Sequence, residues 1–222
     1  MLNVVCFYWS GKDRPGWNDR NLGARYVNAL HRGVQRNLSI PHRFICFSDN
    51  GLKVDKGVEV QNFDSPSWKG CFPKLYAFHP ENGLSDRVVV MDLDLVVCGS
   101  LDDMFSYDGD FMTRMAFRNR LTGKSGGDLV FFRHGTYTNL WHLLHEKFII
   151  LEQEERGRER NVYRKYVGKM DFVQPLYPNQ VLSYRRHVRL GQWHDNCRIV
   201  SFHGKPRPHE LKTEPLVKEH WS

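Results

Sequence analysis

Two aspartates, Asp92 and Asp94, interrupt the most apolar stretch of the sequence, "VVVMDLDLVV" (88–97). Residues two apart on an extended strand point to the same face, so this strand would present both carboxylates together. Burying neighbouring carboxylates is costly unless a cation compensates them. Two hard oxygen ligands suit Mg²⁺ or Mn²⁺, whose remaining positions are filled by water or phosphate oxygens. The spacing therefore predicts a metal site, the alternative being two acids that cap a loop or pair with arginine.

A third metal ligand is predicted at His203, in "IVSFHGKPRPHE" (199–210). It follows an apolar run and precedes Gly204, which lets backbone approach a phosphate, and Lys205, which offers a point charge. An imidazole ligand favours Mn²⁺ over Mg²⁺. His142 and His145 lack the HExxH spacing of zinc proteases. The alternative for His203 is an ordinary histidine in a proline-rich loop.

Length, composition and charge limit the kinds of protein that this sequence can encode. The chain has 222 residues, 41% of them hydrophobic, which fits one ordinary domain over residues 1–222. Its formal net charge of +7 suggests an anionic partner such as a nucleotide, a nucleic acid or a membrane surface. The five cysteines contain no CxxC pair, and the N-terminus does not read as a signal peptide. We therefore expect a cytoplasmic protein without a disulfide framework.

Apolar runs that alternate with helical patterns predict an α/β sandwich with a largely parallel sheet. Strands are expected at 3–9, 43–49, 57–63, 87–97, 110–117, 126–135 and 197–204. Helices are expected at 22–38, 73–80, 100–105, 138–157 and 179–187. In such open sheets the ligand crevice lies at the carboxyl ends of the strands, which is where Asp92 and Asp94 are predicted to be.

The segment "RVVVMDLDLVVCGSLDDMF" (87–105) resembles the DxD strand of GT-A fold glycosyltransferases. The likeness is greatest to the glycogenin and galactosyltransferase-like family 8 and related bacterial and viral enzymes. Further segments resemble motifs of this family in the family's order: "NVVCFYWSGKD", "WKGCFPKLYAF", "GGDLVFFRHG", "YPNQVL" and "FHGKPRPHE". The resemblance covers nearly the whole chain and implies one GT-A catalytic domain.

The resemblance implies metal-dependent transfer of a sugar, with retention of configuration, from a nucleotide-diphosphate donor, expected to be a UDP-sugar. The acceptor would be a glycan, a lipid-linked sugar or a protein. The implied ligands of Mn²⁺ (or Mg²⁺) are Asp92, Asp94 and His203. The implied catalytic residues are Asp94, Asp128 and Gln180. The implied donor contacts are Tyr8, Trp9, Lys12, Lys74, Asp92, Leu93, Gly204 and Lys205.

Two positions depart from the family pattern. In the glycogenin pattern a histidine stands three residues before the glycine, but here His203 is adjacent to Gly204 and Ser201 holds the other place. Asn179 replaces the usual acid of the "D-Q" pair, which removes a carboxylate that could act as nucleophile or stabiliser. The second departure leaves the stereochemical outcome open.

Two other function classes compete with this interpretation. "DLDLV" (92–96) also satisfies the DxDx[TV] motif of haloacid-dehalogenase-type phosphohydrolases, with Asp92 as nucleophile. That motif normally begins its domain, whereas about 90 residues precede it here. A non-enzymatic nucleic-acid-binding protein would use the basic run around Tyr163 and Tyr166, but no nucleic-acid motif accompanies it, and we expect no nucleic-acid partner.

The most basic stretch is "RGRERNVYRKYVGK" (156–169), where a loop or insertion is expected. Among its charges only Glu159 is acidic. A solvated surface segment is one interpretation. The other is a basic lip that contacts an anionic acceptor or the membrane surface, which would make the protein peripheral at the membrane.

Overall fold

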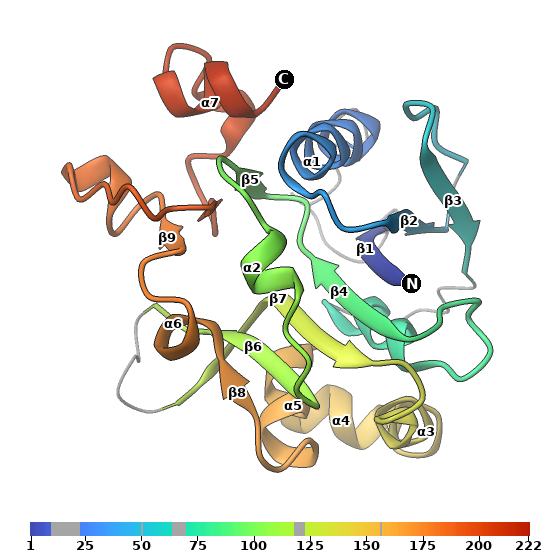
Figure 1. The fold of residues 1–222 in the computed structure, drawn as a ribbon. Coiled ribbons are helices and arrows are strands. Elements are labelled where there is room, and N and C mark those ends of the chain that lie inside the picture. Colours follow the sequence, from blue (N-terminus) through green and yellow to red (C-terminus); the bar gives the residue numbers. More distant parts are fainter. Residues whose placement is uncertain (10–22, 50, 64–69, 118–122, 156) are drawn as a thin grey trace.

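The structure is a computed structural model that describes residues 1–9, 23–49, 51–63, 70–117, 123–155 and 157–222 (Figure 1). Its main sheet has seven strands in the order β3-β2-β1-β4-β7-β6-β8. Four of the six pairings in this order are parallel, and β7 is antiparallel to both of its neighbours. The strands are β1 (Leu2–Tyr8), β2 (His42–Ser48), β3 (Val58–Asn62), β4 (Arg87–Met91), β6 (Phe111–Met115), β7 (Ser125–Arg133) and β8 (Asp171–Phe172).

A second sheet of three short strands has the order β5-β10-β9. It contains β5 (Leu95–Val97), β9 (Val181–Ser183) and β10 (Ile199–Ser201), and all nine residues are buried. The predicted mixed, mainly parallel α/β architecture is therefore confirmed.

Helices cover both faces of the main sheet. They are α1 (Gly23–Asn37), α2 (Asp102–Phe105), α3 (Thr138–Glu146), α4 (Phe148–Glu155), α5 (Glu159–Tyr166), α6 (Val173–Leu176) and α7 (Pro215–His220), with 3₁₀ turns η1 (Phe72–Phe78), η3 (Val188–Leu190) and η4 (Pro208–Glu210). One core cluster joins α1, α2 and the small sheet to one face, and another joins η1 and α3 to α5 to the opposite face. Figure 1 shows α3, α4 and α5 grouped together, well apart from α1.

Strands β1 and β4 illustrate why the sheet forms. "LNVVCFY" and "RVVVM" are apolar along almost their whole length, and both strands are buried on both faces. Continuous apolar runs are typical of parallel strands that are covered by helices on each side. Alternate residues of β1 accordingly enter different cores, with Val4 in the α1 cluster and Val5 in the η1 cluster.

The prediction of one continuous strand over 87–97 is wrong. Strand β4 ends at Met91 and β5 begins at Leu95, and the two belong to different sheets. Between them the Leu95 N–H donates to the Asp92 carbonyl at 3.2 Å, which closes a turn. The turn carries Asp92 and Asp94 out of the sheet at its edge, so the carboxylates are not buried inside a strand.

Three further expectations differ from the structure. The helix predicted over 138–157 is two helices that meet at Lys147. The helix predicted over 179–187 contains strand β9, because its apolar residues pair with β10. The basic stretch at 156–169 is not a loop over its described part. It forms α5, which buries Val162 and Tyr163 against the sheet.

Two further features concern the cysteines and the length of the helices. All five cysteines are free thiols. Within the described ranges, no helix combines the length and the apolar character that crossing a membrane requires.

Candidate active site

The turn of residues Asp92–Leu95, called the acidic turn below, lies where the strand order of the main sheet changes direction. Strands β2 and β3 extend from one side of β1, and β4 lies on its other side, so β1 and β4 flank the switch point. Both are parallel, and their carboxyl ends place Tyr8 and Asp92 at the same edge. Because β7 runs the opposite way, Asp128 near its amino end reaches this edge too, and the Asp92 N–H donates to the Asp128 carbonyl at 2.9 Å. In open α/β sheets, ligands usually bind at this carboxyl-end switch point.

Lys74 anchors the inner side of the turn. Its Nζ lies 2.8 Å from Asp92 Oδ1 and 2.5 Å from Glu159 Oε1, and it donates to the Gly127 carbonyl at 2.9 Å. Only 3% of the lysine side chain is exposed. Burial disfavours the ammonium, but the Asp92 and Glu159 carboxylates outweigh it and hold the pKa of Lys74 well above its ordinary value. Lys74 therefore joins η1, the acidic turn and α5 as a permanent cation.

Two glycines make room for this arrangement. Gly127 has φ +79°, and a Cβ there would lie 2.6 Å from Glu159 Oε1. A Cβ at Gly126 would overlap the guanidinium of Arg114. The "GGD" sequence that precedes the apolar half of β7 is thus explained by the charged groups packed over it.

Asp128 is buried and holds two hydrogen bonds. Arg114 Nε donates to its Oδ1, and Ser201 Oγ donates to its Oδ2 at 2.7 Å. Burial alone would raise the pKa of Asp128, but Arg114 and the Ser201 hydroxyl lower it below its ordinary value. The Arg114 guanidinium also lies 4.2 Å from the centre of the Phe117 ring. Asp128 is therefore a fixed, ionised carboxylate beside the acidic turn.

Asp94 lies on the outer side of the turn. Arg207 Nη1 is 3.4 Å from its Oδ2, and its backbone carbonyl accepts from the Phe202 N–H at 3.0 Å. Burial is the main cause that raises the pKa of Asp94 to about 6 and that of Asp92 to about 7. Repulsion between the neighbouring carboxylates adds to it, in spite of the cations that oppose it. The ionised turn thus carries negative charge that the described cations compensate only in part.

His203 lies beside Asp128 and Arg114 rather than within the turn. Its Nε2 is 2.6 Å from Ser183 Oγ, and its ring stacks on Phe117 with centroids 5.4 Å apart. Burial, followed by the Arg114 charge, lowers its pKa. Among the described side chains no group of three or more His, Cys, Asp or Glu is close enough to hold a metal. The set Asp92, Asp94 and His203 therefore stays a prediction.

Gln180 is not brought to the acidic turn. It precedes β9 at the end of the small sheet that lies away from Leu95, as the pairing of Ser183 with Ser201 and of Ser201 with Leu95 requires. Its Nε2 donates to Asp103 Oδ2 in α2 at 3.1 Å. Its assignment beside the reacting carbon stays a prediction that this geometry does not support.

The remaining predicted donor contacts differ in their exposure, and one of them lies outside the described residues. Tyr8 and Trp9 are half-buried at the end of β1, and Leu93 is half-buried on the acidic turn. Lys205 is exposed in the segment after β10. Lys12 lies outside the described residues.

The sequence interpretation missed Arg114, Arg207 and the site role of Glu159. Arg114 could have been found, because an arginine within the apolar run "DFMTRMAF" needs a buried acid as its partner. Glu159 was visible only as the single acid of a basic stretch. Its contact with Lys74 depends on how α5 packs over β7, which no local pattern reveals.

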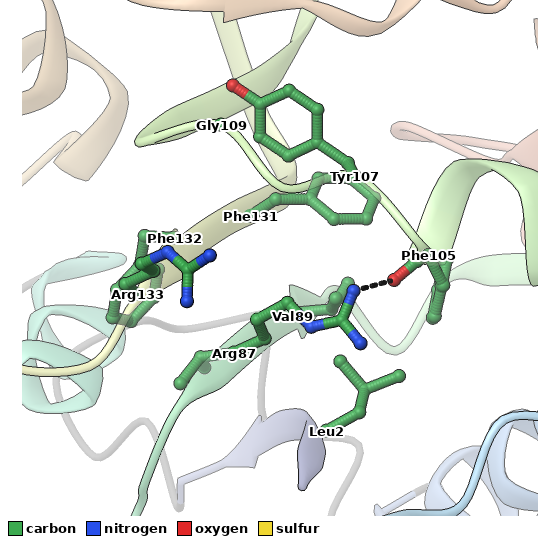
Figure 2. Close-up of a pocket in the computed structure, with 10 residues that line it drawn as sticks. Leu2, Arg87, Val89, Phe105, Tyr107, Gly109, Phe131, Phe132 and Arg133 are labelled. Atoms are coloured by element: carbon green, nitrogen blue, oxygen red, sulfur yellow. Dashed lines mark hydrogen bonds between the residues drawn. The ribbon is translucent and has the colours of Figure 1, made fainter.

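A small hollow lies at the opposite edge of the main sheet (Figure 2). It is lined by the start of β4 and the end of β7, with Phe105 and Tyr107 at its side. Arg87 crosses it and donates to the Phe105 carbonyl at 3.5 Å. None of the predicted site residues lines this hollow, so it is separate from the acidic turn.

Comparison with protein families finds no match for this sequence, and comparison with characterised proteins finds none either. Solved structures are similar in fold. The galactosyltransferase LgtC, in complex with donor and acceptor sugar analogs, matches with a TM-score of 0.66 and 12% identity over 99% of this chain and 96% of its own. An active-site Gln-to-Glu mutant of LgtC matches with a TM-score of 0.61 and 11% identity over 93% of this chain and 89% of its own.

The glycosyltransferase GlyE of Streptococcus pneumoniae TIGR4 also matches, with a TM-score of 0.61 and 12% identity. The match covers 93% of this chain and 55% of GlyE. The chain thus has the GT-A fold predicted from its motifs. A phosphohydrolase interpretation of "DLDLV" gains no support from this fold.

Proposed function

We propose that this protein transfers a sugar from a nucleotide-diphosphate donor, a UDP-sugar, to a glycan, lipid-linked or protein acceptor. The observation that carries the proposal is the acidic turn, in which Asp92 and Asp94 are presented at the switch point between β1 and β4. The fold that surrounds the turn is shared with LgtC and GlyE, which are glycosyltransferases.

The donor set fits a divalent cation. Mg²⁺ and Mn²⁺ are commonly held by one or two carboxylates together with substrate phosphates and water. Among the described residues around the turn, four carboxylates face three cations. They are Asp92, Asp94, Asp128 and Glu159 against Lys74, Arg114 and Arg207. A bound Mn²⁺ would supply Lewis-acid stabilisation of the departing diphosphate. Asp92 and Asp94 would hold it, and His203 is the proposed third ligand.

The other residues of the site bind and orient the donor. Lys74 fixes Asp92 from the interior and adds positive charge toward the donor. Asp128, held ionised by Arg114 and Ser201, accepts hydrogen bonds from sugar hydroxyls. At the end of β1, Tyr8 and Trp9 offer rings on which a base can stack. Beyond β10, Gly204 and Lys205 are the proposed contacts of the donor phosphates.

Two finer points belong to the proposal. The transfer is expected to retain configuration at the anomeric carbon, which NMR of the product's anomeric proton would test.

Gln180 would have to move away from Asp103 to reach the donor, so Gln180→Ala is expected to affect turnover less than a change at Asp94.

The test is thermal unfolding with a panel of nucleotides and nucleotide-sugars, with Mn²⁺ and with excess EDTA. Ligands that bind only the native state raise the melting temperature by mass action. We expect UDP and at least one UDP-sugar to do so with Mn²⁺, and the shift to disappear with EDTA. Slow hydrolysis of the same UDP-sugar, followed by release of UDP, would show catalysis without a known acceptor.

Asp102→Asn is the matched control for Asp94→Asn, because Asp102 is half-buried and bonded to Ser39, away from the turn. The control should keep the Mn²⁺-dependent shift and Asp94→Asn should lose it. Equal UDP binding with Mn²⁺ and with EDTA would contradict the metal bridge. Release of phosphate from simple phosphate esters would favour the phosphohydrolase alternative.

A further inference from the structure

The loop between β9 and β10 forms a projection at residues 185–196. It leaves the small sheet after Ser183 and returns at Cys197, and Figure 1 shows the segment after β9 standing out from the body of the molecule. Ten of its twelve residues are exposed and the other two are half-buried. The Arg189 N–H donates to the Tyr184 carbonyl at 2.8 Å, and the Gln192 N–H donates to the His187 carbonyl at 3.0 Å. The projection is thus folded by its own backbone bonds.

Positive charge collects on this projection. It contains Arg185, Arg186 and Arg189 against a single acid, Asp195. In the part of the chain that the structure describes, none of the three guanidinium groups forms an ion pair. They are free to meet an external anion.

Large apolar side chains are exposed beside these arginines. Leu190 is 65% exposed and Trp193 is 47% exposed, both on the projection. Leu176, 49% exposed, precedes β9. The two segments are tied together, since Asn179 Nδ2 lies 3.0 Å from His194 Nε2. Only two other large apolar side chains of the described chain, Met1 and Ile150, are comparably exposed.

The projection is continuous with the candidate active site. It begins two residues after Ser183, whose hydroxyl bonds His203. Arg185 Nη1 would lie 3.3 Å from a Cβ at Gly204. Whatever binds the projection is therefore held next to the proposed phosphate side of the site.

We propose that residues 185–196, with Leu176, dock the protein on an anionic lipid bilayer. Arginines attract an anionic leaflet, and tryptophan and leucine insert at the headgroup level, which is the combination found here. Neither a polysaccharide nor a nucleic acid would require exposed Leu176 and Leu190. The inference goes beyond the proposed sugar transfer and does not depend on it.

The basic stretch at 156–169 is the competing surface, and its described contacts argue against it. Lys165 Nζ lies 2.6 Å from Glu154 Oε2. Arg164 donates to the Ser125 carbonyl at 2.6 Å and to Asn161 Oδ1 at 3.1 Å. Arg164 and Lys165 are thus engaged within the protein. No large apolar side chain is exposed in the described part of this stretch, whereas the projection exposes Leu190 and Trp193.

The test is co-sedimentation with phosphatidylglycerol–phosphatidylcholine vesicles and with pure phosphatidylcholine vesicles, at low and high salt. Wild type should bind the anionic vesicles at low salt and bind more weakly at high salt. The triple variant Arg185→Ser, Arg186→Ser, Arg189→Ser should lose about 100-fold in partition coefficient, as three basic contacts imply. The pair Leu190→Ser and Trp193→Ser should lose about tenfold, even at low salt.

Each variant has a matched control. Arg158→Ser, Lys165→Ser, Lys169→Ser removes the same charge from exposed positions around α5, and Ile150→Ser removes an exposed apolar side chain elsewhere. Both controls should bind like wild type, and circular dichroism verifies that every variant is folded. Equal losses in the two charge variants would assign binding to net charge and overturn the proposal. So would equal binding to neutral vesicles, no vesicle binding, or loop-dependent binding of heparin without vesicle binding. None of these outcomes involves UDP, so they leave the proposed transfer to its own test.

Discussion

Asp92 and Asp94 are two residues apart, but the protein holds them in different ways. The partner of Asp92 is Lys74, 3% exposed, which also bonds Glu159 and a backbone carbonyl. The partner of Asp94 is Arg207, 26% exposed, whose Nη1 lies 3.4 Å from Asp94 Oδ2. The cation beside Asp92 is thus built into the interior, whereas the cation beside Asp94 is partly exposed to solvent.

This difference between the partners of Asp92 and Asp94 matters for metal binding. A metal-binding turn needs one carboxylate in a fixed position and another whose partner a ligand can replace. A charge that is buried and multiply bonded keeps its position, because breaking any one contact leaves a desolvated partner behind. A partly exposed pair is weak and solvent-screened, so a ligand can replace it. The inner half of the turn thus positions Asp92, while Arg207 can release Asp94 when a cation or a phosphate arrives.

The largest effect is expected for Lys74→Met. This change leaves the buried carboxylate of Glu159 and the inner oxygen of Asp92 without their cation. Removing one partner of a buried pair costs about 3–5 kcal/mol, so the free energy of unfolding in urea should fall by that amount. Adding Glu159→Gln to Lys74→Met should restore part of the loss, because the stranded charge is then gone.

Lys165→Met is the matched control, since Lys165 also bonds a glutamate but is 48% exposed. It should unfold at the same urea concentration as wild type. Equal behaviour of the two lysine variants would mean that the inner half of the turn is not part of the interior.

The strands and their order along the chain could be predicted because each is a dense apolar run between turn signals. "RVVVM" and "RFICFS" have this pattern and are the strands that the structure contains. The break at Asp92 could not be predicted, because "VVVMDLDLVV" reads equally well as one strand. It becomes two strands only because Leu95–Val97 pairs with β10, more than 100 residues later in the chain.

The residues of the candidate site also fall into two groups, those that local motifs predict and those that long-range packing brings to the turn. Asp92, Asp94, Asp128 and Lys74 could be predicted from local motifs, and the structure gathers them at one edge. Arg207 and Glu159 reach the turn through long-range packing, which local patterns do not encode. The prediction for Gln180 rests on a dipeptide alone, and the small sheet places Gln180 at the end of β9 that lies away from Leu95.

The second largest effect is expected for a change at Asp94, on the outer side of the acidic turn. On the proposed function, Asp94→Asn should lower the rate of UDP release from the donor by at least about 100-fold, comparable to removing one charge-stabilising group from an active site. It should not lower the free energy of unfolding at pH 7.5, because the ionised Asp94 is disfavoured there by burial. A variant that turns over normally at unsaturating Mn²⁺ would exclude Asp94 as a metal ligand.

A third prediction concerns pH in the metal-free protein. Burial raises the pKa of Asp94 to about 6 and that of Asp92 to about 7, above the unfolded value of 3.8 for both. The native state therefore binds more protons than the unfolded state between about pH 4 and pH 7. These two groups thus make the free energy of unfolding fall, by at least about 1–2 kcal/mol, as pH rises through that window.

Urea unfolding in EDTA at pH 5 and pH 7.5 measures this change, and the double variant Asp92→Asn, Asp94→Asn isolates it from histidine titration. The difference between wild type and the double variant should be larger at pH 7.5. A difference that is the same at both pH values would show that neither carboxyl group titrates between pH 5 and pH 7.5, which would contradict the raised pKa values.

The smallest effect is expected for Arg207→Ala. The pair with Asp94 is long and partly exposed, so its loss should change the free energy of unfolding by less than about 1 kcal/mol. The same change removes the cation that lowers the pKa of Asp94, so the pH at which Asp94 ionises should rise. Potentiometric or NMR titration of the carboxyl groups in EDTA would measure that rise, with Arg36→Ala, which donates to a backbone carbonyl of His220, as the control. If Arg207→Ala instead destabilises the protein as strongly as Lys74→Met, both halves of the turn are fixed in the interior. A ligand could then reach Asp94 only by a larger rearrangement of the segment that follows β10.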